Sequence, residues 1–464
     1  MTLPQTIGQL RESGYQDRSV KVEMRHNLIR KLQRNETIFP GIIGYEESVI
    51  PQIESAILSG HDLVLLGERG QAKTRIARNL INLLDETVPV VAGCEINDDP
   101  FRPICPACRQ RVEAEGDDVD VHWIPRDRRY GEKLATPDIT IADLIGEVDP
   151  IKVAEGRYLS DELTIHYGLI PRTNRGIFCI NELPDLGERI QVGLLNIMEE
   201  RDVQIRGYKV RLPLDLYVVV SANPEDYTNR GRIITPLKDR FGSQVRTHYP
   251  RTIEHEIDVM EQERTTFADE GFQTFVPPYM KEIIAETTHL ARKNPDVSQR
   301  SGVSARVSIC NYENLLSSAL RRAIRLGERQ VAPRVSDLNA LIPSTQGKIE
   351  LETIGDAKED RVVEKLVQGA TLNVFNRHFS VAEFEPLVAR FEHGLTVEIG
   401  DGMASDRYGR LIGELPELRS AVGQLKADAN PATVASAVEF VLEGLHLNRK
   451  LNKERAAGKS RYRR

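Results

Sequence analysis

The stretch that decides the fold is HDLVLLGERGQAKT, residues 61–74. Its apolar run ends at Leu66 and predicts a buried strand, and the spacing of Ile76, Leu80 and Leu83 predicts a helix directly afterwards. Between them, GERGQAKT fits the pattern GxxxxGK followed by Ser or Thr, except that Ala72 stands where the second glycine usually lies. A strand, a glycine-rich loop and a helix in this order are the setting that a phosphate-binding loop requires.

The residue types of this loop suit the binding of ATP with Mg²⁺. Backbone N–H groups of the loop and of the helix start hold phosphates, Lys73 reaches the β and γ oxygens, and the Thr74 hydroxyl ligates Mg²⁺. The methyl group of Ala72 is a small intrusion as long as the backbone there keeps a negative φ. The alternative is a chance glycine-rich turn, and the position of the motif directly after a buried strand argues against it. We expect the nucleotide to contact Gly67, Glu68, Arg69, Gly70, Gln71, Ala72, Lys73 and Thr74.

Two further buried strands, 176–180 and 216–220, each end in polar residues. Glu182 follows the first strand and is the candidate for orienting the attacking water and accepting its proton. Its neighbour Asn181 can hold a metal-bound water but brings no charge to Mg²⁺. Asn223 follows the second strand, where its amide can hold the water or sense the γ-phosphate. The competing interpretations are an exposed acidic strand end and an ordinary Asn-Pro turn.

Arg240 lies in TPLKDRFG, residues 235–242, just after this region. An arginine supplied by a neighbouring subunit would stabilise charge on the transferring phosphoryl group. An arginine in a surface salt bridge fits the residues equally well, so both interpretations stay open at this point.

Taken together, GERGQAKT, IFCINELPDL, VVSANPEDYTNRG and LKDRFG, in this order, resemble the AAA+ ATPases of the MoxR and magnesium-chelatase ATPase-subunit group. The resemblance covers roughly residues 40–350. It implies an α/β fold, in which a P-loop core with a parallel sheet flanked by helices precedes an α-helical lid. It also implies a ring of identical subunits, a hexamer in this group.

The resemblance assigns a role to each motif residue. Lys73 and Thr74 match the Walker A ligands, Glu182 the Walker B carboxylate, Asn223 sensor 1 and Arg240 the trans arginine finger. Asn181 departs from the aspartate usual in the group, which leaves the rate of hydrolysis open.

Three further assignments rest on the same resemblance. Arg306, in Ser304-Ala-Arg306, resembles sensor 2, with Arg300 as the fallback. Ile43 and Tyr45 resemble the segment on the adenine side of the nucleotide.

The chain divides into four expected regions. They are an N-terminal lead-in (1–40), the AAA+ core (41–249), a helical lid (250–355) and a helical C-terminal region with a basic tail (356–464). Within the core, residues 143–170 resemble the helix-2 insertion of the group, which faces the ring pore or the client. A second insertion, at about 94–125, contains cysteines.

These cysteines offer a metal site. Cys94, the CxxC pair Cys105 and Cys108, and His122 supply four soft ligands for Zn²⁺. The alternative is a mobile loop with unpaired thiols, which the irregular spacing and the acidic stretch EAEGDDVD favour.

Composition and charge narrow the setting. The longest apolar runs are far shorter than a membrane span, the N-terminus has no signal-like apolar segment, and five cysteines without a paired framework fit a reducing compartment, so we expect a cytoplasmic protein. The net charge is −7, whereas residues 448–464 hold eight Lys or Arg and one Glu. We expect this tail to be a solvated, frayed end, and the acidic remainder disfavours nucleic acid as a partner.

The function expected from these features is a ring-forming, ATP-hydrolysing remodelling motor or chaperone. The resemblance implies a partner in trans that carries a von Willebrand factor A domain. Two alternatives remain: the ATPase subunit of a true magnesium chelatase, and a nucleotide-gated scaffold with little hydrolysis, which Asn181 and Ala72 motivate. A σ54-type activator is disfavoured because no GAFTGA-like loop occurs, and a helicase is disfavoured by the acidic core.

Overall fold

The computed structural model describes residues 3–148, 165–199, 202–204, 211–224, 232–268, 270–298, 302–351, 356–456 and 459–464. The chain divides into two compact units, Met1–His248 and Tyr249–Arg464. Residues 149–164, which make up most of the predicted insertion, lie outside the described residues, as does Arg300.

The first unit is built on a sheet of five parallel strands in the order β11-β1-β10-β7-β4. Strands β1, β7 and β10 are buried along their whole length, as expected for a parallel sheet with both faces covered. The strands are β1 (Leu63–Leu66), β4 (Tyr130–Leu134), β7 (Gly176–Asn181), β10 (Leu216–Ala222) and β11 (Ser243–Arg246).

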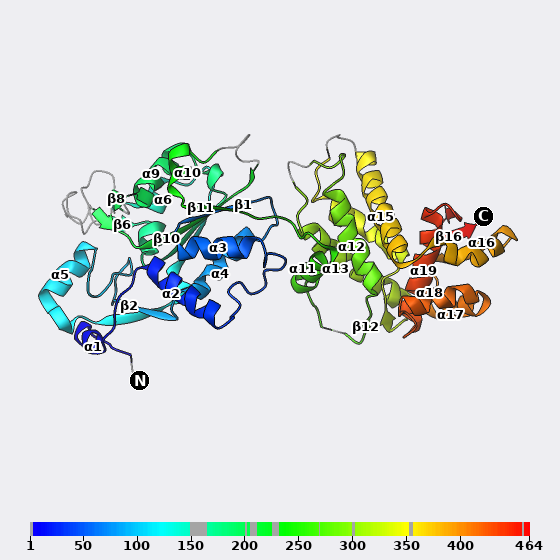
Figure 1. Cartoon of the computed structure of the whole chain (residues 1–464), viewed down its shortest axis with the longest axis horizontal. Helices are drawn as coiled ribbons and strands as arrows, with labels where there is room; N and C mark the ends of the chain where they lie inside the picture. Colours follow the sequence, from blue (N-terminus) through cyan, green and yellow to red (C-terminus); the bar gives the residue numbers. More distant parts are fainter. Residues whose placement is uncertain are drawn as a thin grey trace. The chain divides into compact units, whose positions relative to one another are not determined.

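Alternate residues of β1 face opposite layers of helices. Leu63 and Leu65 belong to the hydrophobic cluster with α2 (Val20–Gln33), α3 (Val49–Leu58) and α4 (Lys73–Asn79). Val64 and Leu66 belong to the cluster with α9 (Glu188–Glu199) and α10 (Thr235–Arg240). Figure 1 shows these two groups of helices on either side of the sheet. The predicted α/β core with a parallel sheet flanked by helices is confirmed.

Residues 1–40 contribute two helices to this unit, α1 (Ile7–Glu12) and α2. On α2, Val20, Met24 and Leu28 are fully buried against the sheet layer. Glu23 of the same helix forms a buried ion pair with Arg129, with 2.5 Å between Oε2 and the guanidinium. The segment that the sequence presents as a lead-in is therefore packed into the core.

The described residues of this unit also form three antiparallel strand pairs. They are β2 (Thr87–Val91) with β3 (Val121–Pro125), β5 (Gly146–Val148) with β6 (Ile165–Tyr167), and β8 (Asp202–Gln204) with β9 (Arg211–Pro213). The pair β8–β9 flanks residues 205–210, which lie outside the described residues. The short helices of this unit are α5 (Pro106–Glu115), α6 (Ile141–Leu144), α8 (Leu169–Arg172) and the 3-10 turns Leu80–Leu83, Gly116–Asp118, Arg126–Arg129 and Leu183–Asp185.

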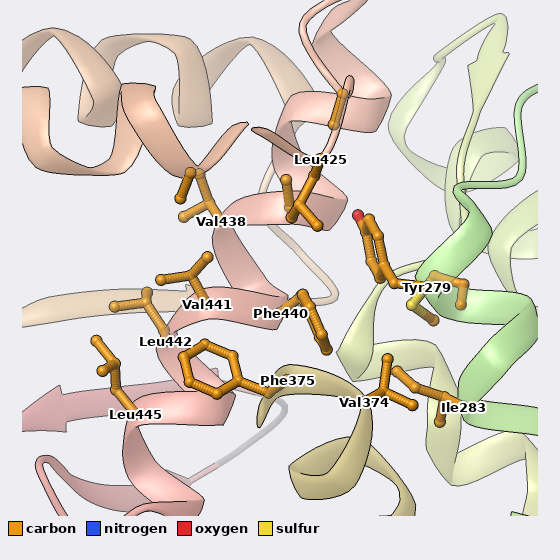
Figure 2. Packing of buried hydrophobic residues seen from close by; sticks show 14 of the residues in the cluster. Tyr279, Ile283, Val374, Phe375, Leu425, Val438, Phe440, Val441, Leu442 and Leu445 are labelled. Carbon is orange, nitrogen blue, oxygen red and sulfur yellow. The ribbon is translucent and has the colours of Figure 1, made fainter. Parts of the chain in front are cut away.

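The second unit is mainly helical, and most of its buried apolar side chains belong to one large hydrophobic cluster. Helix α19 (Pro431–Leu447) begins after the Asn430 cap and is buried on nearly all sides. Figure 2 shows its Phe440 beside Tyr279 of α12 (Pro278–Ala291), and the two rings stack with centroids 4.5 Å apart. The other helices are α11 (Ile253–Glu263), α13 (Arg306–Leu326), α14 (Leu341–Gln346), α15 (Asp356–His378), α16 (Glu385–Glu392), α17 (Ser405–Glu414) and α18 (Pro416–Gln424), with 3-10 turns Val335–Ala340 and Val381–Phe384 and a two-strand pair, β12 (Gln273–Thr274) with β13 (Gln330–Val331).

The basic tail is folded, so the expectation of a frayed end was wrong. Strands β15 (Asn452–Ala456) and β16 (Lys459–Arg463) form a three-stranded antiparallel sheet with β14 (Val397–Gly400). Tyr462 is buried and donates a 2.6 Å hydrogen bond to Glu443 of α19, which also pairs with Lys453 at 2.5 Å. Alternate side chains of the tail therefore face the helical core.

In the part of the chain that the structure describes, no helix is long and apolar enough to cross a membrane.

Candidate functional site

The predicted phosphate loop lies at the carboxyl edge of the parallel sheet, where ligands bind in folds of this class. It leaves β1 at Leu66 and enters α4 at Lys73. The Gly67 N–H donates to the carbonyl of Ala222 on the neighbouring β10 at 3.1 Å. A Cβ at Gly67 would lie 1.8 Å from the hydroxyl oxygen of Thr247, so only glycine fits this close approach.

Lys73 is buried and its ammonium group is folded into the loop. It donates to the carbonyls of Gly67 and Glu68, the latter at 2.9 Å, and to Oδ1 of Asn223 at 2.7 Å. These three acceptors are neutral oxygens, which bind an ammonium less strongly than charged phosphate oxygens do, so bound phosphate can replace them.

The backbone at Ala72 differs from the expectation that a methyl group is tolerated there because φ is negative. Its φ is +57°, in the left-handed region, and not negative as the tolerance of a methyl group at this position required. A non-glycine residue in that region costs about 1–2 kcal/mol. Gly70 of the same loop also has a positive φ, at no such cost.

Gln71 and Tyr45 hold the loop to the end of the first unit. Gln71 is buried, and its Oε1 accepts from the Thr247 hydroxyl at 2.7 Å and from the Glu68 N–H at 3.1 Å. The Tyr45 hydroxyl donates to the carbonyls of Gln71 at 3.0 Å and His248 at 2.6 Å, and burial raises its pKa to about 12. Tyr45 thus ties the segment that is predicted to lie on the adenine side to the loop.

The members of the predicted nucleotide site differ in exposure. Tyr45, Gln71 and Lys73 are buried, Thr74 and Ile43 are half-buried, and Arg69 and Ala72 are exposed. The loop therefore presents both backbone and side chains at its surface.

Glu182 and Asn223, which are 41 residues apart in the sequence, are in direct contact. The Asn223 side-chain amide donates to Glu182 Oε2 at 2.7 Å while its oxygen accepts from Lys73. Glu182 itself has a φ of +55°, the second non-glycine residue of the site in the left-handed region. Strained backbone of this kind persists where surrounding structure holds it, often at functional sites. The structure thus brings together Lys73, Asn223 and Glu182, three residues that the motifs assigned separately to a nucleotide site.

The Asn181 side chain is hydrogen-bonded to two other side chains of this protein, one of which the sequence did not reveal. Its amide donates to Glu132 Oε1 at 2.6 Å, and its oxygen accepts from the Ser221 hydroxyl at 3.2 Å. Glu132 also accepts two hydrogen bonds from Arg78, at 2.8 and 3.1 Å. Glu132 lies on β4, next to β7 in the sheet. A carboxylate is therefore present beside position 181, on a different strand.

Sequence reasoning missed Glu132 because β4, YGEKL, does not show the apolar run of a buried parallel strand. The available signal was the position of the segment between two predicted strands.

The two candidate arginines lie at helix ends. Arg240 is the last residue of α10 and is exposed, with its guanidinium 3.6 Å from the neighbouring Asp239. Arg306 is the first residue of α13 in the second unit, is exposed, and its N–H donates to the Ser304 hydroxyl at 3.1 Å. Their roles at the nucleotide stay predictions.

The cysteine segment does not match either interpretation of the sequence. Cys94, Cys105 and Cys108 converge as the metal-site interpretation expects, but the fourth member of the group is Asp98. His122 is exposed on β3 and does not belong to it, so its assignment as a ligand was wrong. Histidine was chosen for its ligand type, as a soft donor, whereas the loop after β2 turns Asp98 back towards the thiols.

Some proteins of known function are similar to this chain in sequence. No family model matches the chain. It is 27% identical over 270 residues to the magnesium-chelatase subunit ChlI of Oryza sativa subsp. japonica, covering 54% of this chain and 58% of the relative. It is 24% identical over 321 residues to ChlI of Nephroselmis olivacea, covering 66% and 86%. The chain thus spans somewhat more than half the length of the first of these curated relatives.

A solved structure is also similar, that of the complex between subunits BchI and BchD of magnesium chelatase. The match has 20% identity and a TM-score of 0.37, and it covers 71% of this chain and 98% of that chain. Because this TM-score is low, the assignment rests on the motifs, the sheet and the sequence relatives. These three make the chain similar to the AAA+ ATPases of the MoxR and magnesium-chelatase group.

Proposed function

We propose that this chain binds ATP with Mg²⁺ and hydrolyses it within a ring-shaped homo-oligomer, a hexamer. The ring remodels a client through a partner protein that carries a von Willebrand factor A domain and acts in trans. The observation that carries the ATPase assignment is the chain of contacts from Lys73 through Asn223 to Glu182. One amide links the ammonium that would bind phosphate to the carboxylate that would activate water.

Each residue of this chain has a defined task. Lys73 would exchange its loop acceptors for the β and γ oxygens of ATP. Asn223 would then orient Glu182, whose carboxylate accepts the proton of the attacking water. Both side chains are held by the ends of neighbouring strands, so little reorganisation is needed at the moment of reaction.

The oxygen donors beside the loop suit Mg²⁺, which prefers hydroxyl, carboxylate and amide oxygens. Thr74 would ligate the ion directly and Asn181 through a water, with the charge of Glu132 close to Asn181. A bound Mg²⁺ neutralises charge on the β and γ phosphates.

Steady-state ATP hydrolysis, measured over a range of protein concentrations, tests the proposal. Turnover per chain should rise with protein concentration, because each site is complete only when a neighbouring subunit of the ring supplies Arg240. It should collapse in Glu182→Gln and Arg240→Ala. Arg419→Ala, an exposed arginine of α18, is the matched control and should keep full activity. Tight ATP binding without turnover by the wild-type protein would overturn the motor assignment.

Mixing the two inactive variants tests whether Arg240 acts in trans. In a mixed ring, a Glu182→Gln subunit supplies an intact Arg240 to a neighbour that has an intact Glu182. Random equimolar mixing should therefore restore about a quarter of the wild-type sites, because each closed-ring interface pairs two independent subunits. No recovery would show that both residues serve the same subunit's nucleotide.

One observation favours a second candidate, a nucleotide-gated scaffold with little hydrolysis. Both ends of the Asn181 amide are already engaged by Glu132 and Ser221, and the position lacks a charge. This candidate predicts tight ATP binding with no turnover, alone or with partners.

The names of the relatives favour a narrower version of the motor, the ATPase subunit of a magnesium chelatase. The test is insertion of Mg²⁺ into protoporphyrin by a chelatase reaction from which the ATPase subunit has been left out. Restored insertion on adding this chain supports the chelatase role, and ATP turnover without insertion supports the remodelling role.

A further inference from the structure

Away from the nucleotide loop, three thiols and a carboxylate of the first unit converge on one point. Cys94 follows β2, Asp98 lies in the loop after it, and Cys105 and Cys108 lie at the start of α5. One ligand atom from each side chain lies within 4.8 Å of all the others. Cys105, Cys108 and Asp98 are buried and Cys94 is half-buried.

Asp98 is the least expected member, because a buried carboxylate needs partners. Its side chain has no exposed surface, and its Oδ2 accepts from the Cys105 N–H at 3.0 Å. Its Oδ1 is buried and has no hydrogen-bond partner. Leaving such an oxygen unpaired carries the full desolvation penalty of a charged group. A cation bound among the four side chains would satisfy it.

The backbone around the thiols favours the ligand form of cysteine. Cys94 Sγ accepts from the N–H groups of Ile96 at 3.4 Å and Asp98 at 3.3 Å. Cys105 Sγ accepts from the Cys108 N–H at 3.3 Å, within the Cys-Pro-Ala-Cys turn. Donors aimed at sulfur stabilise the thiolate, which is the species that binds metals.

We propose that Cys94, Asp98, Cys105 and Cys108 bind a structural Zn²⁺ ion. Three thiolates and one carboxylate complete a tetrahedral set for zinc, whose closed sites have four protein ligands. With Zn–S bonds of about 2.3 Å, tetrahedral geometry places two sulfurs about 3.8 Å apart, within the observed spread. Four ligands leave no open position, so the ion would hold structure and take no part in hydrolysis.

The residues around the proposed zinc site fit the charge and the position of the ion. Three thiolates and a carboxylate around Zn²⁺ leave the centre negative, and Arg111 lines the same pocket. Ile165 and Tyr167 of β6 also line it. The ion would therefore link the segment after β2 to helix α5. Both lie beside β6, a strand near the end of the predicted insertion 143–170.

The test is the metal content of the full chain, purified from zinc-supplemented cells and measured by inductively coupled plasma mass spectrometry. We expect one zinc ion per chain in the wild type, and its loss in Cys105→Ser. Asp98→Ala should weaken zinc affinity by more than about 100-fold, beyond the effect of losing an outer-shell partner. Cys310→Ser, a half-buried cysteine of α13 outside the group, should keep the ion.

Cobalt substitution separates a lost ligand from a lost fold. Co²⁺ in the wild type should show intense tetrahedral d–d bands and thiolate-to-cobalt charge transfer. Asp98→Asn, which keeps the shape of the side chain, should retain the charge transfer but change the d–d bands. A wild-type chain that binds neither zinc nor cobalt and whose three thiols all react with a thiol reagent would overturn the proposal. So would equal metal loss in Cys310→Ser.

Discussion

The side-chain amide of Asn181 donates a hydrogen bond of 2.6 Å to the carboxylate of Glu132. Asn181 ends β7 and Glu132 lies on the adjacent β4, so two neighbouring strands share one polar contact at the edge that carries the nucleotide loop. The charge that aspartate would bring at position 181 is therefore already present on the next strand. A second carboxylate there would face the first.

Asn181→Asp should consequently destabilise the first unit, although aspartate is the residue usual in this group. The new carboxylate loses the donor to Glu132 and repels it, which we expect to lower the free energy of unfolding by about 1–3 kcal/mol. Urea denaturation followed by fluorescence of Trp123, the single tryptophan of the sequence, measures this unit. Adding Glu132→Gln to the variant should recover at least half of the loss. No recovery would mean that the two side chains are not coupled.

Ala72→Gly should stabilise the protein. Glycine adopts the positive φ of this position without the steric cost that alanine bears, so we expect a gain of about 0.5–1 kcal/mol after the larger unfolded-state entropy of glycine is subtracted. Ala77→Gly, in the ordinary helical backbone of α4, is the control and should destabilise by about 1 kcal/mol or more. The same Trp123 measurement applies to both variants. Equal losses in the two would contradict the left-handed backbone at Ala72.

Asn223→Asp should separate ATP binding from turnover. The new side chain still accepts from Lys73 but loses the donor to Glu182 and repels its carboxylate. We expect kcat to fall about 100-fold or more, as when one oriented donor is lost from a catalytic site. The ATP dissociation constant, measured by isothermal titration calorimetry, should change far less. An unchanged kcat would show that the contact between Asn223 and Glu182 does not serve hydrolysis.

Acid should weaken the attachment of the C-terminal sheet through Glu443. Burial by itself raises the pKa of Glu443, but Lys453 and the Tyr462 hydroxyl outweigh it, and the net pKa is lowered. A lowered carboxyl pKa contributes stability above the unfolded-state value, about 4.3 for glutamate, and loses it as pH falls through the folded value.

Glu443→Gln should therefore destabilise at pH 7 and lose this penalty on acidification below about pH 4. Melting followed by far-ultraviolet circular dichroism from pH 7 to acid measures the difference. Glu398→Gln removes an exposed partner of Arg461 in the same sheet and should have little effect at either pH. A penalty for Glu443→Gln that does not depend on pH would contradict the shifted pKa.

Local pattern was enough to predict the elements around the loop. The run before Gly67, the pattern of GERGQAKT and the apolar spacing after it are properties of neighbouring residues, and β1, the loop and α4 lie where that pattern places them. The sequence placed Glu182 and Asn223 just after two buried strands, and the structure brings them together because the carboxyl ends of parallel strands share one edge.

What the sequence by itself determined is the fold class: the order of the motifs, the parallel sheet and the position of the loop, all of which follow from short-range periodicity and backbone preference. Tertiary structure alone decided which polar groups become partners. Glu132 reaches Asn181 and Asp98 reaches the thiols because distant or irregular segments pack together and exclude water there. The backbone at Ala72 and the folded tail have the same origin. Closing a loop and burying alternate side chains depend on the surrounding fold, which local composition does not encode.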